Sequence, residues 1–141
     1  MKPRYLLDTN ILSEVLKPVP SASVIAQINM HSRELATASA VVHEISFGCR
    51  RLPVDSRRRL EIQRYLDELI PRELTIFNYD TDAALWHSEQ RAGLAAQGKS
   101  PSFVDGQIAS IAYVNDLILV TRNVDDFSGF EGLSVNNWFE C

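Results

Sequence analysis

The chain has 141 residues, of which 45% are hydrophobic and 23% charged, and this predicts one globular domain over residues 1–141. The net charge of −4 argues against a protein that coats nucleic acid without specificity. Cys49 and Cys141 have neither a metal-site nor a disulfide spacing, and the longest apolar runs are far below the roughly 20 residues that span a bilayer. The start MKPRYLLDTN lacks the apolar core of a signal peptide, so we expect a cytoplasmic protein without membrane contact.

The first third of the chain is predicted to alternate short strands with helices. The apolar run YLLD gives a buried strand over residues 4–7, which directs Asp8 into a turn. The next elements are expected to be a helix up to Pro18, a helix capped by Ser21 or Ser23 that ends near His31, and a strand that ends near Ser39.

The middle of the chain is predicted to hold two helices and a basic segment. In VVHEISFGCRRL, at 41–52, apolar residues recur at offsets of 4, 7 and 11, and Glu44 lies half-buried beside that face. Pro53 ends this helix, Ser56 caps the next, and Pro71 is expected to end it. Residues 50–72 hold half of the 14 basic residues, namely Arg50, Arg51, Arg57, Arg58, Arg59, Arg64 and Arg72.

The remaining elements complete the pattern of an α/β fold. We expect a strand in LTIFNY, a helix from Asp80 to Gly98, a helix from Phe103 to Tyr113, a strand in LILVT, a polar turn in RNVDDF and a last short strand in LSVNNW. Short uninterrupted strands that alternate with helices are typical of a parallel sheet. The prediction is therefore a central, mostly parallel sheet with helices on both faces.

Three acids occupy positions where a carboxylate is costly. Asp8 follows a buried strand, and Glu44 and Asp105 lie on or beside the inward faces of helices. Ligands of open α/β sheets bind at the carboxyl ends of the strands, where the polar turn RNVDDF also lies. A buried carboxylate costs several kcal/mol without compensation, and no lysine or arginine recurs beside all three. A hard cation such as Mg²⁺ or Mn²⁺ would compensate them.

Each of these acids also has a purely structural interpretation. Asp8 fits a helix N-cap, Glu44 fits an edge residue that reaches solvent, and Asp105 fits a helix N-terminus. At least one of Asp125 and Asp126 fits a turn former.

Other kinds of active site are less consistent with the sequence. The three histidines, His31, His43 and His87, have no His or Cys partner at ligand spacing, which favours packing or surface roles. There is no GxSxG motif and no glycine-rich phosphate loop, so a covalent triad or a P-loop enzyme is not expected.

Four motifs together resemble the PIN-domain ribonucleases. They are LLDTN at 6–10, Glu44 in VVHEISFG, Asp105 in FVDGQIASIA, and LVTRNVDDF at 119–127. In this order they are similar to the VapC-like toxins of type II toxin–antitoxin pairs and to the related FitB subgroup. The resemblance implies an endoribonuclease that depends on Mg²⁺ or Mn²⁺ and hydrolyses RNA phosphodiesters with a metal-activated water.

The same resemblance implies roles for particular residues. Asp8, Glu44 and Asp105 would hold one or two metal ions. Asn123 stands where some members have an aspartate, so either Asn123 or Asp126 would complete the catalytic set. Two further positions would support these groups: Asn10 would brace Asp8, and Thr121 would hydrogen-bond a ligand carboxylate or a water.

Partners follow from the resemblance and from the charge distribution. Arg50, Arg51, Arg57 and Arg58 are candidates for contact with RNA phosphates, because an acidic site alone would repel RNA; a solvated face or a set of structural salt bridges is the alternative. The resemblance also implies a homodimer and a VapB-like antitoxin that inhibits the enzyme in a hetero-oligomer.

Two other functions stay open at this point. One is a catalytically silent PIN-like module that binds RNA or protein. The other is a Mg²⁺-dependent phosphohydrolase of the haloacid-dehalogenase type, which normally has a second aspartate two residues after the first. This chain has Asn10 at that position.

Overall fold

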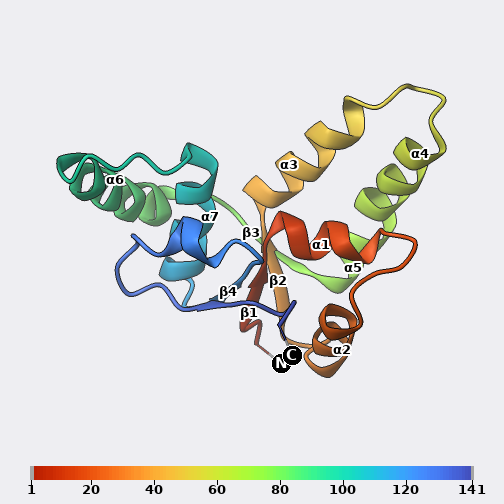
Figure 1. Ribbon diagram of the computed structural model, residues 1–141, viewed down its shortest axis with the longest axis horizontal. Helices are drawn as coiled ribbons and strands as arrows, with labels where there is room; N and C mark the ends of the chain where they lie inside the picture. The colour runs from red at the N-terminus through yellow and green to blue at the C-terminus, as the bar shows by residue number, and fades with distance from the viewer. Residues whose placement is uncertain (1, 141) are drawn as a thin grey trace.

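Five short strands form the centre of the fold, which a computed structural model describes over residues 2–140. The strands are β1 (Tyr5–Leu7), β2 (Leu35–Ala38), β3 (Thr75–Phe77), β4 (Ile118–Val120) and β5 (Val135–Asn136). Their order in the sheet is β3-β2-β1-β4-β5, and all four neighbouring pairs are parallel (Figure 1). The predicted parallel sheet is confirmed, including the last short strand.

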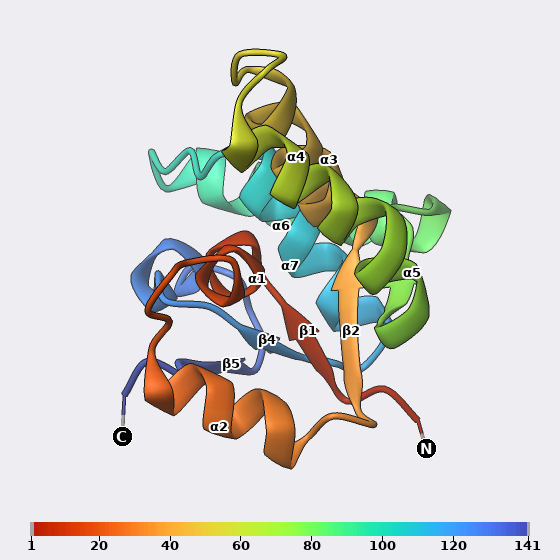
Figure 2. The same cartoon turned by 90° about the vertical axis from the view of Figure 1, so that its right-hand side faces the viewer.

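Helices cover both faces of this sheet. α6 (Thr81–Ala96) and α7 (Phe103–Val114) lie on one side, and α1 (Thr9–Val15), α2 (Ala22–Met30) and α5 (Ile70–Glu73) lie on the other (Figures 1 and 2). Because both faces are covered, β1 and β2 are buried at every position and their sequences are apolar runs rather than alternating patterns. The remaining pair, α3 (Ser39–Arg50) and α4 (Arg57–Arg64), projects beyond the sheet (Figure 1).

Several predicted helix ends are confirmed by their hydrogen bonds. The hydroxyl of Ser21 accepts from the Val24 amide at 3.4 Å, and that of Ser56 accepts from the Arg59 amide at 3.3 Å. Asp80 caps α6 in the same way at 2.9 Å. Beyond the far end of α6, Gly98 has a positive φ of 75°, a conformation that glycine adopts without strain.

One predicted helix end is wrong. The helix after Ser56 does not stop before Pro71 but continues through α5 to Glu73. Between α4 and α5 the chain forms a π-helical turn over Tyr65–Leu69, in which the Ile70 amide donates to the carbonyl of Tyr65. Pro71 then lies in the first turn of α5, where a residue without an N–H is tolerated.

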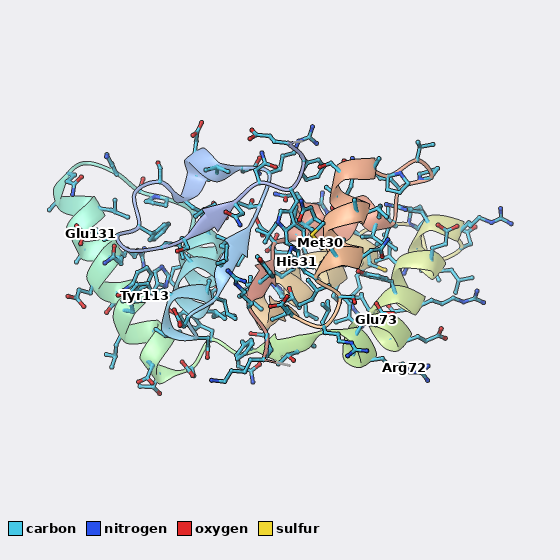
Figure 3. The ribbon with its side chains drawn as sticks, turned by 90° about the horizontal axis from the view of Figure 1, so that it is seen from below. Met30, His31, Arg72, Glu73, Tyr113 and Glu131 are labelled. Carbon is cyan, nitrogen blue, oxygen red and sulfur yellow. The ribbon has the colours of Figure 1, made fainter. Side chains whose placement is uncertain are left out.

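The amino end of the sheet is closed by aromatic packing. The His31 ring lies 4.5 Å from the ring of Tyr5 and 5.7 Å from that of Trp138, measured between centroids. Figure 3, which views the molecule from below, shows His31 at the end of α2. The predicted packing role of His31 is confirmed, and His31 lies at the opposite end of β1 from Asp8.

The carboxyl end of the sheet contains a switch in strand order. From β1 the chain passes to β2 on one side, whereas β4 pairs with β1 on the other side. Such a switch is where open α/β sheets bind ligands, and Asp8 and Thr121 follow the two strands that flank it. Within residues 2–140, no helix is long and apolar enough to cross a membrane. Cys49 is buried and free, and Cys141 lies outside the described residues.

Candidate active site

Asp8 is a buried carboxylate, only 6% exposed, at the carboxyl end of β1. Its Oδ1 accepts a hydrogen bond from the Thr9 amide at 2.7 Å, which confirms the predicted N-cap of α1. Its Oδ2 accepts from the Thr121 hydroxyl at 2.8 Å. The cap of α1 therefore uses only Oδ1 of Asp8, while Oδ2 is hydrogen-bonded to Thr121, the residue that follows β4.

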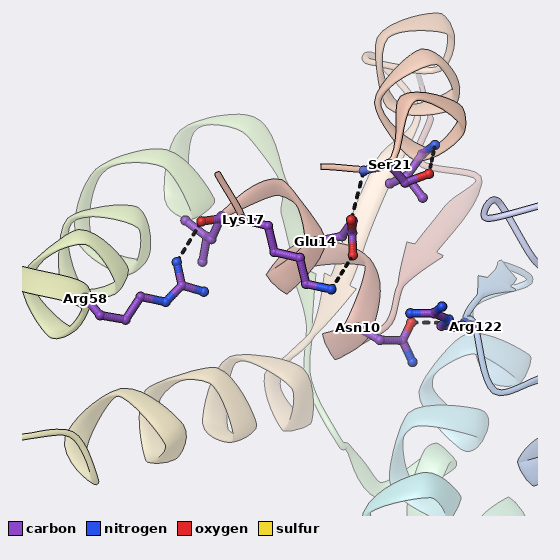
Figure 4. Close-up of polar contacts among 8 residues, drawn as sticks. Asn10, Glu14, Lys17, Ser21, Arg58 and Arg122 are labelled. Carbon is purple, nitrogen blue, oxygen red and sulfur yellow. Dashed lines mark hydrogen bonds and ion pairs between the residues drawn. The ribbon is translucent and has the colours of Figure 1, made fainter. Parts of the chain in front are cut away.

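Thr121 joins the two chain segments at the switch. Its fully buried hydroxyl donates to Asp8 and accepts from Asn10 Nδ2 at 3.2 Å and from the Asn123 amide at 3.1 Å. Asn10 completes the connection, because its Oδ1 accepts from the Arg122 amide at 3.0 Å (Figure 4). Both ends of the Asn10 amide are thus engaged, so Asn10 braces the site and is not placed to act as the second acid of a phosphohydrolase.

Three further acids come from separate elements. Glu44 projects from α3 with 38% of its side chain exposed, close to the predicted half-burial. Asp105 lies in the first turn of α7, where its amide donates to the hydroxyl of Ser102 at 3.1 Å. Asp126 is exposed in the 3-10 helix η2 (Val124–Phe127).

The charges of these acids act on one another's pKa values. Burial raises the pKa of Asp8 most, the charges of Asp126 and Glu44 raise it further, and hydrogen bonds from Thr121 and Thr9 oppose the rise. Burial also raises the pKa of Asp105 most, and the charges of Asp8, Asp126 and Glu44 add to it. Asp8, Glu44, Asp105 and Asp126, called the acidic cluster below, therefore lie near enough for their charges to repel one another.

The donor set of this acidic cluster fits a hydrated cation. Within the described part of the chain, no three His, Cys, Asp or Glu side chains are grouped so that they could hold a metal ion by themselves. Mg²⁺ usually keeps several waters and takes one or two carboxylates from the protein, so it does not need such a closed group. Carboxylates with raised pKa values provide hard oxygen donors and a reason to bind positive charge.

Glu14 is a buried carboxylate with a structural role, and the sequence pattern did not single it out. It pairs with Lys17 at 2.9 Å and accepts from the Ser21 amide at 2.8 Å, which joins α1 to α2 (Figure 4). Lys17 and the Ser21 amide lower the pKa of Glu14, the opposite of the shift in the acidic cluster. Glu14 is thus already compensated and needs no cation.

The predicted RNA-contacting arginines differ in their surroundings. Arg58 Nη1 donates to the carbonyl of Leu16 at 2.7 Å, which fastens α4 to the end of α1 (Figure 4). The Arg51 guanidinium lies over the exposed ring of Phe47, 5.4 Å from its centroid. Arg50 and Arg57 are exposed. The structure therefore gives Arg58 a packing contact and leaves the other three on the surface.

His87 packs behind the helix that carries Asp105. It is 3% exposed, and its Nδ1 lies 2.8 Å from the Tyr79 hydroxyl. A Cβ added to Gly106 would lie 2.0 Å from His87 Nε2, so only glycine fits there. The predicted packing role of His87 is confirmed. Its contact with Gly106 could not be predicted from helical periodicity, because the two residues lie on different helices.

Replacing Gly106 by alanine should displace Asp105, its neighbour on α7. Alanine normally stabilises a helix relative to glycine by about 1 kcal/mol, but here the new methyl group meets the buried His87 ring. We expect a net loss of about 1–3 kcal/mol in the free energy of unfolding, measured by urea denaturation. The matched control is Gly93→Ala on α6, where nothing lies within 4 Å of the added Cβ. Equal stability of the two variants would contradict the packing described here.

Comparison with known proteins identifies the family. The PIN domain matches residues 5–132. A VapC ribonuclease of Sinorhizobium fredii is 31% identical over 137 residues, which are 96% of this chain and 97% of the relative. A protein of Shigella flexneri named tRNA(fMet)-specific endonuclease VapC is 29% identical over 135 residues, covering 96% and 98% of the two chains.

Solved structures agree with the sequence relatives. FitAcB from Neisseria gonorrhoeae superimposes with a TM-score of 0.86 at 26% identity, covering 97% of this chain and 99% of that one. VapBC2 from Rickettsia felis, bound to a promoter DNA fragment, has a TM-score of 0.82 at 26% identity, with coverage of 98% and 99%. The chain belongs to the PIN-domain family and, within it, to the VapC-like proteins, as its four ordered motifs predict.

Proposed function

We propose that this protein is the toxin of a toxin–antitoxin pair, an endoribonuclease that hydrolyses RNA phosphodiesters with Mg²⁺ or Mn²⁺ as cofactor. The observation that supports this most strongly is the acidic cluster at the switch point. In addition, two relatives that align with this chain over almost their whole length are named an endonuclease and a ribonuclease. Burial first, and then the neighbouring carboxylate charges, raise the pKa values of Asp8 and Asp105, so positive charge beside them would be favourable. A divalent cation is the natural partner of such a site.

The residues of the chain have distinct tasks in this proposal. Asp8, Glu44 and Asp105 would hold the cation, in part through its waters, and when bound it would supply a water of lowered pKa and stabilise negative charge on the phosphate. Thr121 and the Thr9 amide fix both oxygens of Asp8 and favour its ionised form, since their hydrogen bonds oppose the rise in its pKa. No protein nucleophile is needed, because water attacks the phosphodiester.

We assign the fourth acidic position to Asp126 rather than Asn123. The charge of Asp126 raises the pKa of both Asp8 and Asp105, which supports a place for its carboxylate near theirs. The Asn123 amide instead donates to Thr121, which gives Asn123 a bracing contact through its backbone.

Partners are proposed from the relatives of this chain. Solved relatives are VapBC and FitAB complexes, which supports a VapB-like antitoxin bound to this chain in a hetero-oligomer. We also propose a homodimer and a cytoplasmic site of action, where the RNA substrate is found. The antitoxin would keep the ribonuclease inactive until it is released.

The basic segment offers a test of RNA contact. Arg57→Ala should weaken RNA binding and lower the slope of log affinity against log salt by about 0.7, the value for one phosphate contact on a single strand. Arg58→Ala should weaken RNA binding too, and it should in addition lower the free energy of unfolding by about 1–3 kcal/mol, because the hydrogen bond from Arg58 to the Leu16 carbonyl is lost. Fluorescence anisotropy in 50–300 mM salt measures the slope, and an unchanged slope in Arg57→Ala would exclude Arg57 from the RNA interface.

Cleavage of total RNA tests the proposed function. Purified protein free of any antitoxin should produce discrete cuts with Mg²⁺ or Mn²⁺ and none with EDTA. Asp8→Asn should slow cleavage by about 10²–10⁴-fold, since loss of charge stabilisation costs several kcal/mol. Absence of cutting by folded, metal-supplied protein across RNA classes would instead favour the catalytically silent binding module.

A further inference from the structure

Two exposed phenylalanines lie on the helices that carry Glu44 and Asp105. Phe47 follows Glu44 by three residues on α3, and Phe103 precedes Asp105 by two residues on α7. The two residues are 52% and 50% exposed, although a phenylalanine side chain gains free energy by burial. α3 packs against α7, so the two rings lie on the two helices that present these acids (Figure 1).

Each ring carries the same kind of companions. The Arg51 guanidinium lies over Phe47 at 5.4 Å, and that of Arg91 lies over Phe103 at 5.2 Å. Each ring also has a histidine beside it: His43 is stacked on Phe47 at 6.2 Å and His87 is tilted against Phe103 at 4.9 Å. An aromatic ring with a cation above it, in solvent, offers both a π-face and a positive charge to a ligand.

On α3 these groups form a stripe that starts at the acidic cluster. His43, Phe47 and Arg51 are spaced by four residues and therefore share one face of the helix. His43 Nδ1 lies 3.8 Å from Glu44 Oε1. A chain-like ligand that leaves the acidic cluster along α3 would thus meet a histidine ring, a phenylalanine ring and a guanidinium in succession.

On the α7 side the ring borders a cavity. The cavity has a volume of about 350 Å³, and its lining includes Tyr79, His87, Arg91 and Phe103 together with three alanines of α6. This volume is within the range of small-molecule sites, and its walls are largely aromatic or apolar with one cation. The cavity is therefore suited to a flat ring attached to a negatively charged backbone.

We propose that Phe47 and Phe103 are stacking platforms for unpaired bases of the RNA substrate, Phe47 along α3 and Phe103 at the cavity between α6 and α7. This inference rests on the proposed ribonuclease function and adds the form of the substrate, a single strand with its bases turned outward. Arg51 and Arg91 complement the RNA charge beside a site that is itself acidic. Single-stranded RNA is generally bound in this way, by aromatic stacking along a positively charged path.

Binding of defined oligonucleotides tests the proposal without cleavage. The probes are fluorescein-labelled octa-adenylate and an abasic octamer of the same sugar-phosphate chain, in EDTA, with a gel to confirm that the RNA stays intact. Phe47→Ala and Phe103→Ala should each bind octa-adenylate about 5- to 100-fold more weakly and bind the abasic octamer as the parent does. Phe→Tyr at either position should restore binding because the ring remains, whereas Phe→Leu, which keeps the apolar bulk, should not.

Controls separate stacking from other roles. Leu85→Ala, which truncates a 63% exposed side chain on α6, should leave both affinities unchanged. Unchanged octa-adenylate affinity in both phenylalanine-to-alanine variants, or a parent that does not prefer octa-adenylate to the abasic octamer, would overturn the proposal. So would a change in sedimenting mass with unchanged RNA affinity, which would make this surface a contact between protein chains. Base-dependent binding by a parent that cleaves no RNA would support the stacking platforms and refute only the ribonuclease function.

Discussion

Asp105→Asn should abolish RNA cleavage and at the same time make the metal-free protein more stable. Cleavage should fall by about 10²–10⁴-fold, because a carboxylate that holds the cation is lost. The melting temperature at pH 7 without metal should rise by about 2–4 °C, as expected when about 1 kcal/mol of burial cost and charge repulsion at Asp105 is relieved in a chain of this size. Activity is measured on total RNA, and stability by thermal unfolding in EDTA.

The pH dependence of this gain follows from the raised pKa of Asp105. In the folded protein Asp105 holds its proton to a higher pH than its ordinary pKa of 3.8, so stability is lost as the pH rises from that value through the folded pKa. The advantage of Asp105→Asn should therefore be full at neutral pH and vanish as the pH falls below 3.8, where both states bind the proton. Asp125→Asn is the matched control on the exposed 3-10 helix, since Asp125 is not among the charges that act on Asp8 or Asp105. A metal-free Asp105→Asn protein that melts at or below the parent would contradict the repulsion.

Thr121→Val should slow cleavage by about 10- to 100-fold and change its pH dependence. Valine has the shape of threonine, but it leaves Asp8 Oδ2, Asn10 Nδ2 and the Asn123 amide without their common partner. Because the Thr121 hydrogen bond lowers the pKa of Asp8, its loss should raise that pKa. The acidic limb of the pH–rate profile should therefore move to higher pH, and the free energy of unfolding should fall by about 1–3 kcal/mol.

The control for this prediction is Thr121→Ser, which keeps the hydroxyl and loses only a methyl group. It should retain the pH–rate profile of the parent, even if the small cavity lowers its stability. The role of the hydroxyl would be refuted if the valine variant kept the parent profile and rate.

The main features of the site follow from local sequence. Apolar runs that end in polar residues predict buried parallel strands, and the carboxyl ends of such strands share one edge of the sheet. The sequence thus predicts that Asp8 and Thr121 lie at the same edge, and the pairing of β1 with β4, seen only in the structure, brings them into contact. The helical spacing of Glu44 and Asp105 relative to apolar residues places both on inward or bordering faces. In the structure the charges of Glu44 and Asp8 raise the pKa of Asp105, and that of Glu44 raises the pKa of Asp8.

Other features depend on contacts between distant segments, which periodicity does not encode. Arg58 resembles its exposed neighbours in the sequence, yet it donates to a carbonyl 42 residues away. The glycine at position 106 is set by the His87 ring on another helix. The prediction that Pro71 ends a helix is wrong because the chain forms a π-helical turn before it, and this turn has no local signature in the sequence. Ser102 did have a signal, a serine three residues before Asp105 in the pattern of a capping box.

The most direct test of the central claim measures Mn²⁺ occupancy and RNA cleavage on the same samples. The claim is that the acidic cluster binds the cation that makes this protein a ribonuclease. Electron paramagnetic resonance reports free Mn²⁺ during a titration, and initial cleavage rates are taken at each point. We predict that rate and occupancy saturate together in the parent, and that Asp8→Asn and Asp105→Asn weaken both by at least about 10-fold. Mn²⁺ binding that is unchanged in these variants while cleavage persists would show that the catalytic metal lies elsewhere.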